Sequence, residues 1–191
     1  MLVPDTAALL IIDVQQAIDH PQWARWGPRN NPAAEDHIAQ LLAVWRATQR
    51  PIIHVRHMSR EPHSPYRPQQ PGNEFKPPVA PLPLERIVDK TTNSAFIGTT
   101  LEADLRAAGI DTLIITGVIT NNSVEATARM AGNLGFNTIV VADATATFAR
   151  PDFNGVLRSA EEVHALSLAN LQDEYAAIRS TREVLAALAR A

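Results

Sequence analysis

Residues 112–129 decide the fold of this chain, and they read TLIITGVITNNSVEATAR. A β-branched apolar run reaches Gly117 and a short polar turn, after which small residues recur at helical spacing. The pattern predicts a strand, a tight turn and a helix that opens at Ser123. A hydroxyl in that position would meet unpaired backbone N–H donors and the positive end of a helix dipole. Such surroundings suit a nucleophile, although a serine at a helix start is often only an N-cap.

Apolar runs alternate with amphipathic segments along the rest of the chain. Strands are predicted at residues 7–13, 51–57, 86–90, 112–116, 138–142 and, at a sheet edge, 175–179. Helices are predicted at residues 33–49, 98–108, 122–134, 160–171 and 181–189, the last capped by Thr181. This alternation is typical of a three-layer α/β protein, in which two layers of helices cover a six-stranded, mostly parallel sheet.

Length and composition narrow the class of protein. A chain of 191 residues that is 46% hydrophobic is expected to form a single domain over residues 1–191. A net charge of -3 without a run of like charges argues against nucleic acid and membrane as partners. Cysteine is absent, which excludes disulfides and thiolate metal sites. Because neither a bilayer-spanning apolar stretch nor signal-peptide features are present, a cytoplasmic location is expected.

A proline-rich segment at residues 61–83 holds most of the 14 prolines. It is too polar and too often interrupted for regular structure. Loops of this length in a compact domain usually serve function or assembly. We therefore expect the segment to cover the site or a neighbouring subunit.

Two further polar residues occupy the ends of predicted strands. Asp13 directly follows a buried apolar run, and Lys90 ends another strand. Ligands of parallel sheets bind beyond the carboxyl ends of the strands, the edge at which Ser123 is also expected. Considered alone, Asp13 is equally well explained as a structural carboxylate. Considered alone, Lys90 is typical of a solvated surface lysine. Taken together, the three residues supply an acid or base, a cation and a nucleophile.

Three stretches of the chain resemble one known superfamily. Residues 8–15 (ALLIIDVQ), residues 88–96 (VDKTTNSAF) and the residues around Ser123 resemble the isochorismatase-like cysteine hydrolases, in the same order and spacing. That superfamily includes nicotinamidases, N-carbamoylsarcosine amidase, ureidoacrylate and biuret amidohydrolases, and streptothricin hydrolase. The resemblance implies an isochorismatase-like (Rossmann-like) fold and a catalytic Asp, Lys and Cys, which fall on Asp13, Lys90 and Ser123. Serine therefore stands where most members have cysteine.

The resemblance also implies a role for each residue. Asp13 takes the proton of the nucleophile and later delivers it to the leaving amine. Lys90 holds that carboxylate in place and stabilises charge on the substrate. The implied oxyanion hole consists of the backbone N–H groups of Ile119 and Ser123, next to a cis peptide bond between Val118 and Ile119. No metal or organic cofactor is implied.

Serine at position 123 weakens this chemistry. A lysine and a helix dipole can shift a thiol toward its thiolate, whereas a hydroxyl is far too basic for an Asp–Lys pair to ionise. We therefore expect Ser123 to bind substrate well and to turn it over slowly, if at all. The sequence leaves open whether this serine is natural or replaces a cysteine in an inactivated form.

Several side chains are candidates for contact with the substrate. Gln16, Trp23 and Trp26 follow the first strand, Phe96 follows the lysine, and Asn121 and Asn122 precede the nucleophile. Each has an ordinary structural role as an alternative, and the tryptophans suit core or subunit packing equally well.

The strand at residues 51–57 carries further polar residues. Arg56 could meet a substrate carboxylate or pair with an acidic neighbour. His54 and His57 are three positions apart and should point to opposite faces of a strand, which argues against joint metal ligation. Nicotinamidases of the superfamily carry an Asp-x-His pair and a further His near this position, and Arg56-His57-Met58 does not match that pattern, which argues against nicotinamidase activity.

The function expected from these residues is that of an amidohydrolase. It would cleave the C–N bond of a small amide, ureide or cyclic amide through an acyl-enzyme on residue 123. One alternative is hydrolysis of an isochorismate-type vinyl ether, with Asp13 as the acid and no need for a thiol. Another is a non-catalytic ligand-binding or assembly protein. Members of the superfamily are commonly oligomers, so a homodimer or homotetramer is expected, with the proline-rich segment and the C-terminal helix as candidate interfaces.

Overall fold

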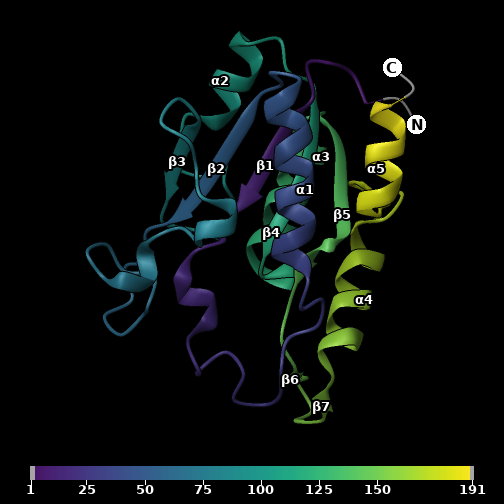
Figure 1. Ribbon diagram of the computed structural model, residues 1–191. Coiled ribbons are helices and arrows are strands. Elements are labelled where there is room, and N and C mark those ends of the chain that lie inside the picture. The colour runs from purple at the N-terminus through teal and green to yellow at the C-terminus, as the bar shows by residue number, and fades with distance from the viewer. Residues whose placement is uncertain (1–2, 190–191) are drawn as a thin grey trace.

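Residues 3–189, the part of the chain that the computed structural model describes, contain a six-stranded sheet in the order β3-β2-β1-β4-β5-β8. Every neighbouring pair of its strands is parallel. The strands are β1 (Ala8–Ile12), β2 (Ile52–His57), β3 (Arg86–Lys90), β4 (Thr112–Val118), β5 (Asn137–Ala146) and β8 (Ala177–Arg179). The predicted fold class is confirmed (Figure 1).

Helices cover both faces of the sheet. They are α1 (Ala34–Ala47), α2 (Leu101–Ala107), α3 (Glu125–Asn133), α4 (Ala160–Leu171) and α5 (Thr181–Leu188). Helices α1 and α5 contribute to one hydrophobic cluster, and α2, α3 and α4 contribute to the other. In Figure 1, α1 crosses in front of the strands. Within residues 3–189, the helices are all too short or too polar to cross a bilayer.

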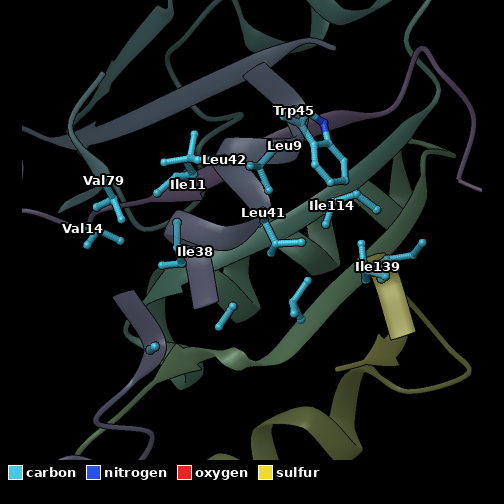
Figure 2. Packing of buried hydrophobic residues seen from close by; sticks show 14 of the residues in the cluster. Leu9, Ile11, Val14, Ile38, Leu41, Leu42, Trp45, Val79, Ile114 and Ile139 are labelled. Carbon is cyan, nitrogen blue, oxygen red and sulfur yellow. The ribbon is translucent and has the colours of Figure 1, made fainter. Parts of the chain in front are cut away.

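The core forms around β1, which is buried along its whole length. Leu9 and Ile11 share a cluster with Leu41 and Leu42 of α1, as Figure 2 shows. Leu10 and Ile12 belong to the cluster on the opposite face. Each such side chain contributes about 1.5–3 kcal/mol when fully buried. A strand that is apolar on both faces is therefore stable only in the centre of a covered sheet.

The strand order places a crevice beside β1. The chain steps outward from β1 to β2 and β3, then crosses back to β4 and steps outward the other way to β5 and β8. The loops that leave β1 and β4 consequently diverge at the carboxyl ends of these strands, where parallel sheets bind their ligands.

Short elements complete the structure. They are the hairpin of β6 (Arg150–Pro151) and β7 (Leu157–Arg158), the 3-10 turns η1 (Gln16–Asp19), η2 (Pro71–Asn73) and η3 (Pro77–Val79), and the one-turn π-helix η4 (Thr120–Val124). The proline-rich segment holds only η2 and η3, and it is anchored by the buried side chains of Tyr66, Asn73 and Val79. Asn73 Nδ2 donates to the carbonyl oxygens of His57 at 2.9 Å and Tyr66 at 2.8 Å.

Strand β5 is longer than predicted. It continues past Ala142 to Ala146, because it resumes pairing with β4 after an irregularity in register. Asp143 therefore lies inside the strand. Its Oδ1 accepts hydrogen bonds from the backbone N–H of Thr181 at 2.7 Å and from the Thr181 hydroxyl at 2.8 Å. A bulge of this kind interrupts the alternation of side chains, so periodicity underestimates the strand.

Helix α5 begins at Thr181, as predicted, but its N-cap lies one residue before the predicted cap. Its N-cap is Ser180, which forms a capping box with Glu183, and Thr181 is the first helical residue. The apolar side chains Val184 and Ala187 are buried in the core of the same chain. This face of the C-terminal helix is therefore not available as an interface between subunits.

Candidate active site

A buried lysine brings the three predicted catalytic residues together. Lys90 Nζ lies 2.6 Å from Asp13 Oδ2 and donates to Ser123 Oγ at 3.2 Å. Asp13 follows β1, Lys90 ends β3, and Ser123 lies beyond β4. Their exposed fractions are 3%, 1% and 6%, respectively. The site is thus largely shielded from water, which strengthens the attraction between the ammonium and the carboxylate.

Lys90 has two further polar neighbours. Its Nζ donates to the carbonyl oxygen of Thr92 at 3.1 Å and lies 3.4 Å from His57 Nδ1. An ammonium has three N–H donors, so four acceptors compete for them. Burial lowers the pKa of His57, while Asp13 opposes the shift and Lys90 adds to it. A neutral imidazole can accept a hydrogen bond from the ammonium, so His57 is a fourth member of this cluster.

Sequence reasoning considered His57 only as a metal ligand. The available signal was the position of His57 at the end of β2, in register with Lys90 at the end of β3. His54 faces elsewhere, with its Nε2 2.9 Å from Glu85 Oε2. Among residues 3–189, no three His, Asp or Glu side chains are grouped closely enough to hold a metal ion.

Asp13 combines an unusual backbone with an unsatisfied oxygen. Its φ of 54° lies in the left-handed region, which aspartate tolerates better than most residues. Its N–H donates to the carbonyl oxygen of Val55 at 2.9 Å. Its Oδ1 is buried and has no hydrogen-bond partner within the described residues. Buried carboxylate oxygens nearly always have a partner, so this atom is positioned to receive a proton donor from a ligand or from the nucleophile.

Ser123 does not open a helix, contrary to the sequence prediction. It lies in the π-helical turn η4, and α3 begins only at Glu125. Its hydroxyl accepts from Lys90 and makes no capping bond to the helix. The turn is closed by Ile119, whose carbonyl oxygen accepts from Val124 N at 3.3 Å. Single π turns are frequent at functional sites, where they re-aim one side chain.

Close packing of two strands shapes the start of this turn. A Cβ atom on Gly117 would lie 2.1 Å from the carbonyl oxygen of Ile12, and the φ of Gly117 is 116°. Only glycine fits such a position. The peptide bond between Val118 and Ile119 is cis. The implied oxyanion-hole residue Ile119 thus lies two residues after the tight contact between Gly117 and Ile12.

Side chains from neighbouring elements brace the turn. Thr120 Oγ1 lies 3.0 Å from Nδ1 of His164 on α4. Asn121 Oδ1 accepts from the hydroxyl of Thr147 at 2.5 Å. These contacts join the turn to α4 and to the segment that follows β5.

A cavity of about 410 Å³ adjoins the turn. Three loops line it: the loop after β1, the η4 turn, and the segment after β5. The predicted substrate-binding residues Trp23, Trp26 and Asn122 are all in its lining. Asp13, Lys90 and Ser123 are buried and are not part of the lining, although Ser123 directly follows the lining residue Asn122 in the turn. The cavity therefore suits the part of a substrate that does not react.

Sequence reasoning missed the wall that follows β5. Thr147, Phe148, Arg150 and Pro151 line the cavity, as does Arg25 from the loop after β1. Because β5 was expected to end at residue 142, nothing in the sequence of residues 147–151 indicated that they line a cavity. The only indication was that they follow a strand. Its position depends on the continued pairing of β5 with β4.

Three other predicted contact residues lie away from this cavity. Gln16 lines a separate surface hollow beside the proline-rich segment. Arg56 donates to both carboxylate oxygens of Asp89, at 2.7 and 2.9 Å, which is the acidic pairing considered as its alternative. Phe96 stacks on Phe136 with ring centroids 5.7 Å apart.

Known proteins resemble the chain along most of its length. An Isochorismatase domain model matches residues 7–183. The crystal structure of an isochorismatase-family protein from Chromobacterium violaceum ATCC 12472 matches with a TM-score of 0.96 and 54% identity, covering 100% of this chain and 98% of that one. YrdC, an isochorismatase-family protein of Bacillus subtilis, is 43% identical over 93% of this chain and 94% of its own length. Streptothricin hydrolase of Streptomyces noursei is 35% identical over 87% of this chain and 60% of its own length, and further relatives are amidohydrolases.

Proposed function

Because the chain belongs to the isochorismatase family of hydrolases, we propose that it cleaves the C–N bond of a small amide, ureide or cyclic amide through an acyl-enzyme on Ser123. The observation that carries this proposal is the contact of one buried ammonium, Lys90 Nζ, with both Asp13 and Ser123. A carboxylate, a cation and a nucleophile in contact are the groups that acyl transfer requires. The amidohydrolases among the relatives support the same class of reaction.

The first half of the reaction forms an ester on the protein. Ser123 Oγ attacks the carbonyl carbon while its proton passes to Asp13, whose Oδ1 is free to accept it. The N–H groups of Ile119 and Ser123 stabilise the resulting oxyanion, and Lys90 balances the developing negative charge. Collapse of the tetrahedral intermediate breaks the C–N bond, and Asp13 returns the proton to the leaving amine.

The second half releases the product. A water molecule attacks the ester carbon and gives its proton to Asp13, and the same proton then passes to Ser123 Oγ as the C–O bond to the protein breaks. The serine limits the first half, since a hydroxyl loses its proton far less readily than a thiol near Lys90. We therefore expect slow turnover by the chain with serine and faster turnover after Ser123→Cys.

The test compares the protein with its Ser123→Cys and Ser123→Ala forms on a panel of amides, ureides and lactams. Ammonia or amine release reports turnover, and intact-protein mass spectrometry reports the acyl intermediate. The expected result is turnover with a transient acyl mass for Ser123→Cys, a lower rate for serine and none for alanine. Absence of any gain on Ser123→Cys, or reaction of the serine form alone, would overturn the acyl-enzyme mechanism.

A second candidate function is hydrolysis of an isochorismate-type vinyl ether. The observation that favours it is the free Oδ1 of Asp13 beside a residue 123 that is not a thiol, since protonation of a vinyl ether needs only an acid. Pyruvate release from isochorismate would select this reaction. Ser123→Ala should then retain activity and Asp13→Asn should lose it. A protein that binds ligands of both classes without turnover would instead be a non-catalytic homologue.

We also propose that the chain forms a homodimer or homotetramer. The apolar face of α5 is buried within its own chain, so the proline-rich segment remains as the candidate interface, with Leu82 there 51% exposed. Light scattering after size-exclusion chromatography should give a multiple of the 20.8 kDa chain mass. A single mass of 20.8 kDa would contradict the proposal.

A further inference from the structure

The cavity beside the η4 turn is cationic. Its lining includes Arg25 and Arg150 and no acidic side chain. Within residues 3–189, neither of these two guanidinium groups forms an ion pair. Arg158, by contrast, forms an ion pair, with its Nη2 2.8 Å from Asp152 Oδ2. Two unneutralised cations at the same concave surface attract an anion.

The acid closest to Arg150 in the chain is already engaged. Asp152 Oδ1 accepts from the N–H groups of Asn154 at 2.9 Å and Val156 at 3.0 Å, and its Oδ2 accepts from Arg158 Nε at 2.9 Å. Both oxygens of Asp152 therefore have partners, and Asp152 does not neutralise Arg150. The positive charge of Arg150 can thus attract an anionic ligand.

Arg25 contacts an aromatic ring and has a side chain suited to carboxylate recognition. Its Cζ lies 3.8 Å from the centroid of the Trp26 ring. Contact with an aromatic face stabilises a guanidinium without using its N–H groups as hydrogen-bond donors to the ring. A planar fork of N–H donors matches the two oxygens of a carboxylate.

The remaining lining suits a short hydrocarbon segment. Trp23, Phe148 and Pro151 provide apolar surface in the same cavity. Its volume of about 410 Å³ lies within the range of small-molecule pockets. One wall consists of Ile119, Asn121 and Asn122, the residues that lead to Ser123. A substrate that reacts at Ser123 would thus extend its far end toward the two arginines.

We propose that Arg25 and Arg150 make this cavity select amides and ureides that carry a carboxylate at the end away from the scissile bond. The inference rests on the proposed function for the reacting end of the substrate, whereas the cavity itself defines the charged end. It assigns substrate recognition to residues other than Arg56, whose guanidinium is bonded to Asp89.

The test uses two probes that differ in one group, succinamate, which has an amide and a carboxylate, and succinamide, which has two amides. Rates are measured in the Ser123→Cys form, alone and combined with Arg25→Gln, Arg150→Gln or the control Arg182→Gln, an exposed arginine on α5. We expect kcat/KM to be at least tenfold higher for succinamate. Each of the two cavity variants should lower it by about tenfold to a hundredfold through KM, as expected when a charged hydrogen bond is lost. The values for succinamide and for Arg182→Gln should not change.

Binding to the serine form separates failure of this inference from failure of the proposed function. Fluorescence of the 3 tryptophans reports titration with either probe. If no amide is turned over but succinamate binds more tightly than succinamide and loses that advantage in Arg150→Gln, the proposed function fails and the anion preference stands. Equal turnover or equal binding of the two probes, or no binding of either, would overturn the anion preference.

Discussion

Lys90 Nζ and Asp13 Oδ2 lie 2.6 Å apart, although 77 positions separate the two residues in the chain. Their side chains are 0% and 5% exposed. Desolvation offsets most of the attraction within a buried pair, so the pair contributes little net stability. Removal of one partner, however, leaves the other as an uncompensated buried charge. The candidate active site is in this way coupled to the stability of the fold.

We expect Lys90→Met to lower the free energy of unfolding by about 3–5 kcal/mol at pH 7, because Asp13 is left buried without its counter-ion. Combining Lys90→Met with Asp13→Asn should restore most of the loss. Urea denaturation of the parent, both single variants and the double variant measures the coupling. A double variant as unstable as Lys90→Met would show that lost packing, and not the unpaired charge, causes the effect.

Gly117→Ala should lower the free energy of unfolding by about 3 kcal/mol or more, since the added Cβ would lie 2.1 Å from the carbonyl oxygen of Ile12. The matched control is Gly98→Ala, which has a φ of 72° but no atom within 4 Å of the new Cβ. The control should lose only about 1–2 kcal/mol, the strain of a left-handed backbone. Equal losses in thermal denaturation would mean that the approach of β4 to β1 is not tight.

The carboxylate of Glu35 predicts an acid dependence of stability. Burial favours its protonated form, but hydrogen bonds and charges from Arg29 and Lys76 prevail and lower its pKa from 4.5 to about 2. A pKa that is lower in the folded chain adds stability above pH 4.5, and this stability is lost as the pH falls toward 2. At pH 7 the ionised Glu35 should contribute on the order of 3 kcal/mol, from 1.36 kcal/mol per pKa unit.

Comparison with Glu35→Gln tests this dependence. Urea denaturation at pH 7 should show the variant to be less stable than the parent, and the difference should shrink steadily below the usual pKa of Glu35. A difference that stays constant down to pH 2.5 would indicate that size or hydrogen bonding, rather than charge, is responsible.

His57 predicts a second pH effect, at the site itself. Its pKa is lowered chiefly by burial, so the imidazole is neutral at pH 7. Its Nδ1 can then accept a hydrogen bond from Lys90 Nζ, which lies 3.4 Å away. Because the pKa is lower in the folded chain, the stabilising contribution is complete above the usual 6.5 and is lost as the pH falls through the lowered value. Protonation would place two cations in contact and should reduce the activity of the Ser123→Cys form.

NMR titration of the His57 ring should therefore give a pKa below 6.5, and the His57→Asn variant should lose the corresponding acid step in the rate profile. A titration midpoint of the His57 ring at or above 6.5 would contradict the prediction that burial keeps this ring neutral at pH 7. An acid step unchanged in His57→Asn would assign it to another group.

The sequence by itself determined the elements and their common edge. Continuous apolar runs such as residues 8–12 can be stable only inside a covered parallel sheet, and amphipathic spacing identifies the helices that cover it. Asp13, Lys90 and Ser123 each follow or end a strand, which was enough to predict that they approach one another. These features depend on side chains a few positions apart, so they can be read without knowing the contacts between distant segments.

Only the tertiary structure decided how the site is built. Ser123 lies in a π turn rather than at a helix start, beyond the close packing of Gly117 against Ile12. The pairing of Arg56 with Asp89, and the cavity that holds Arg25 and Arg150, follow from which strands and loops lie side by side. Contacts of this kind join positions far apart in the chain and depend on strand register and backbone approach, for which the periodicity of the sequence contains no signal.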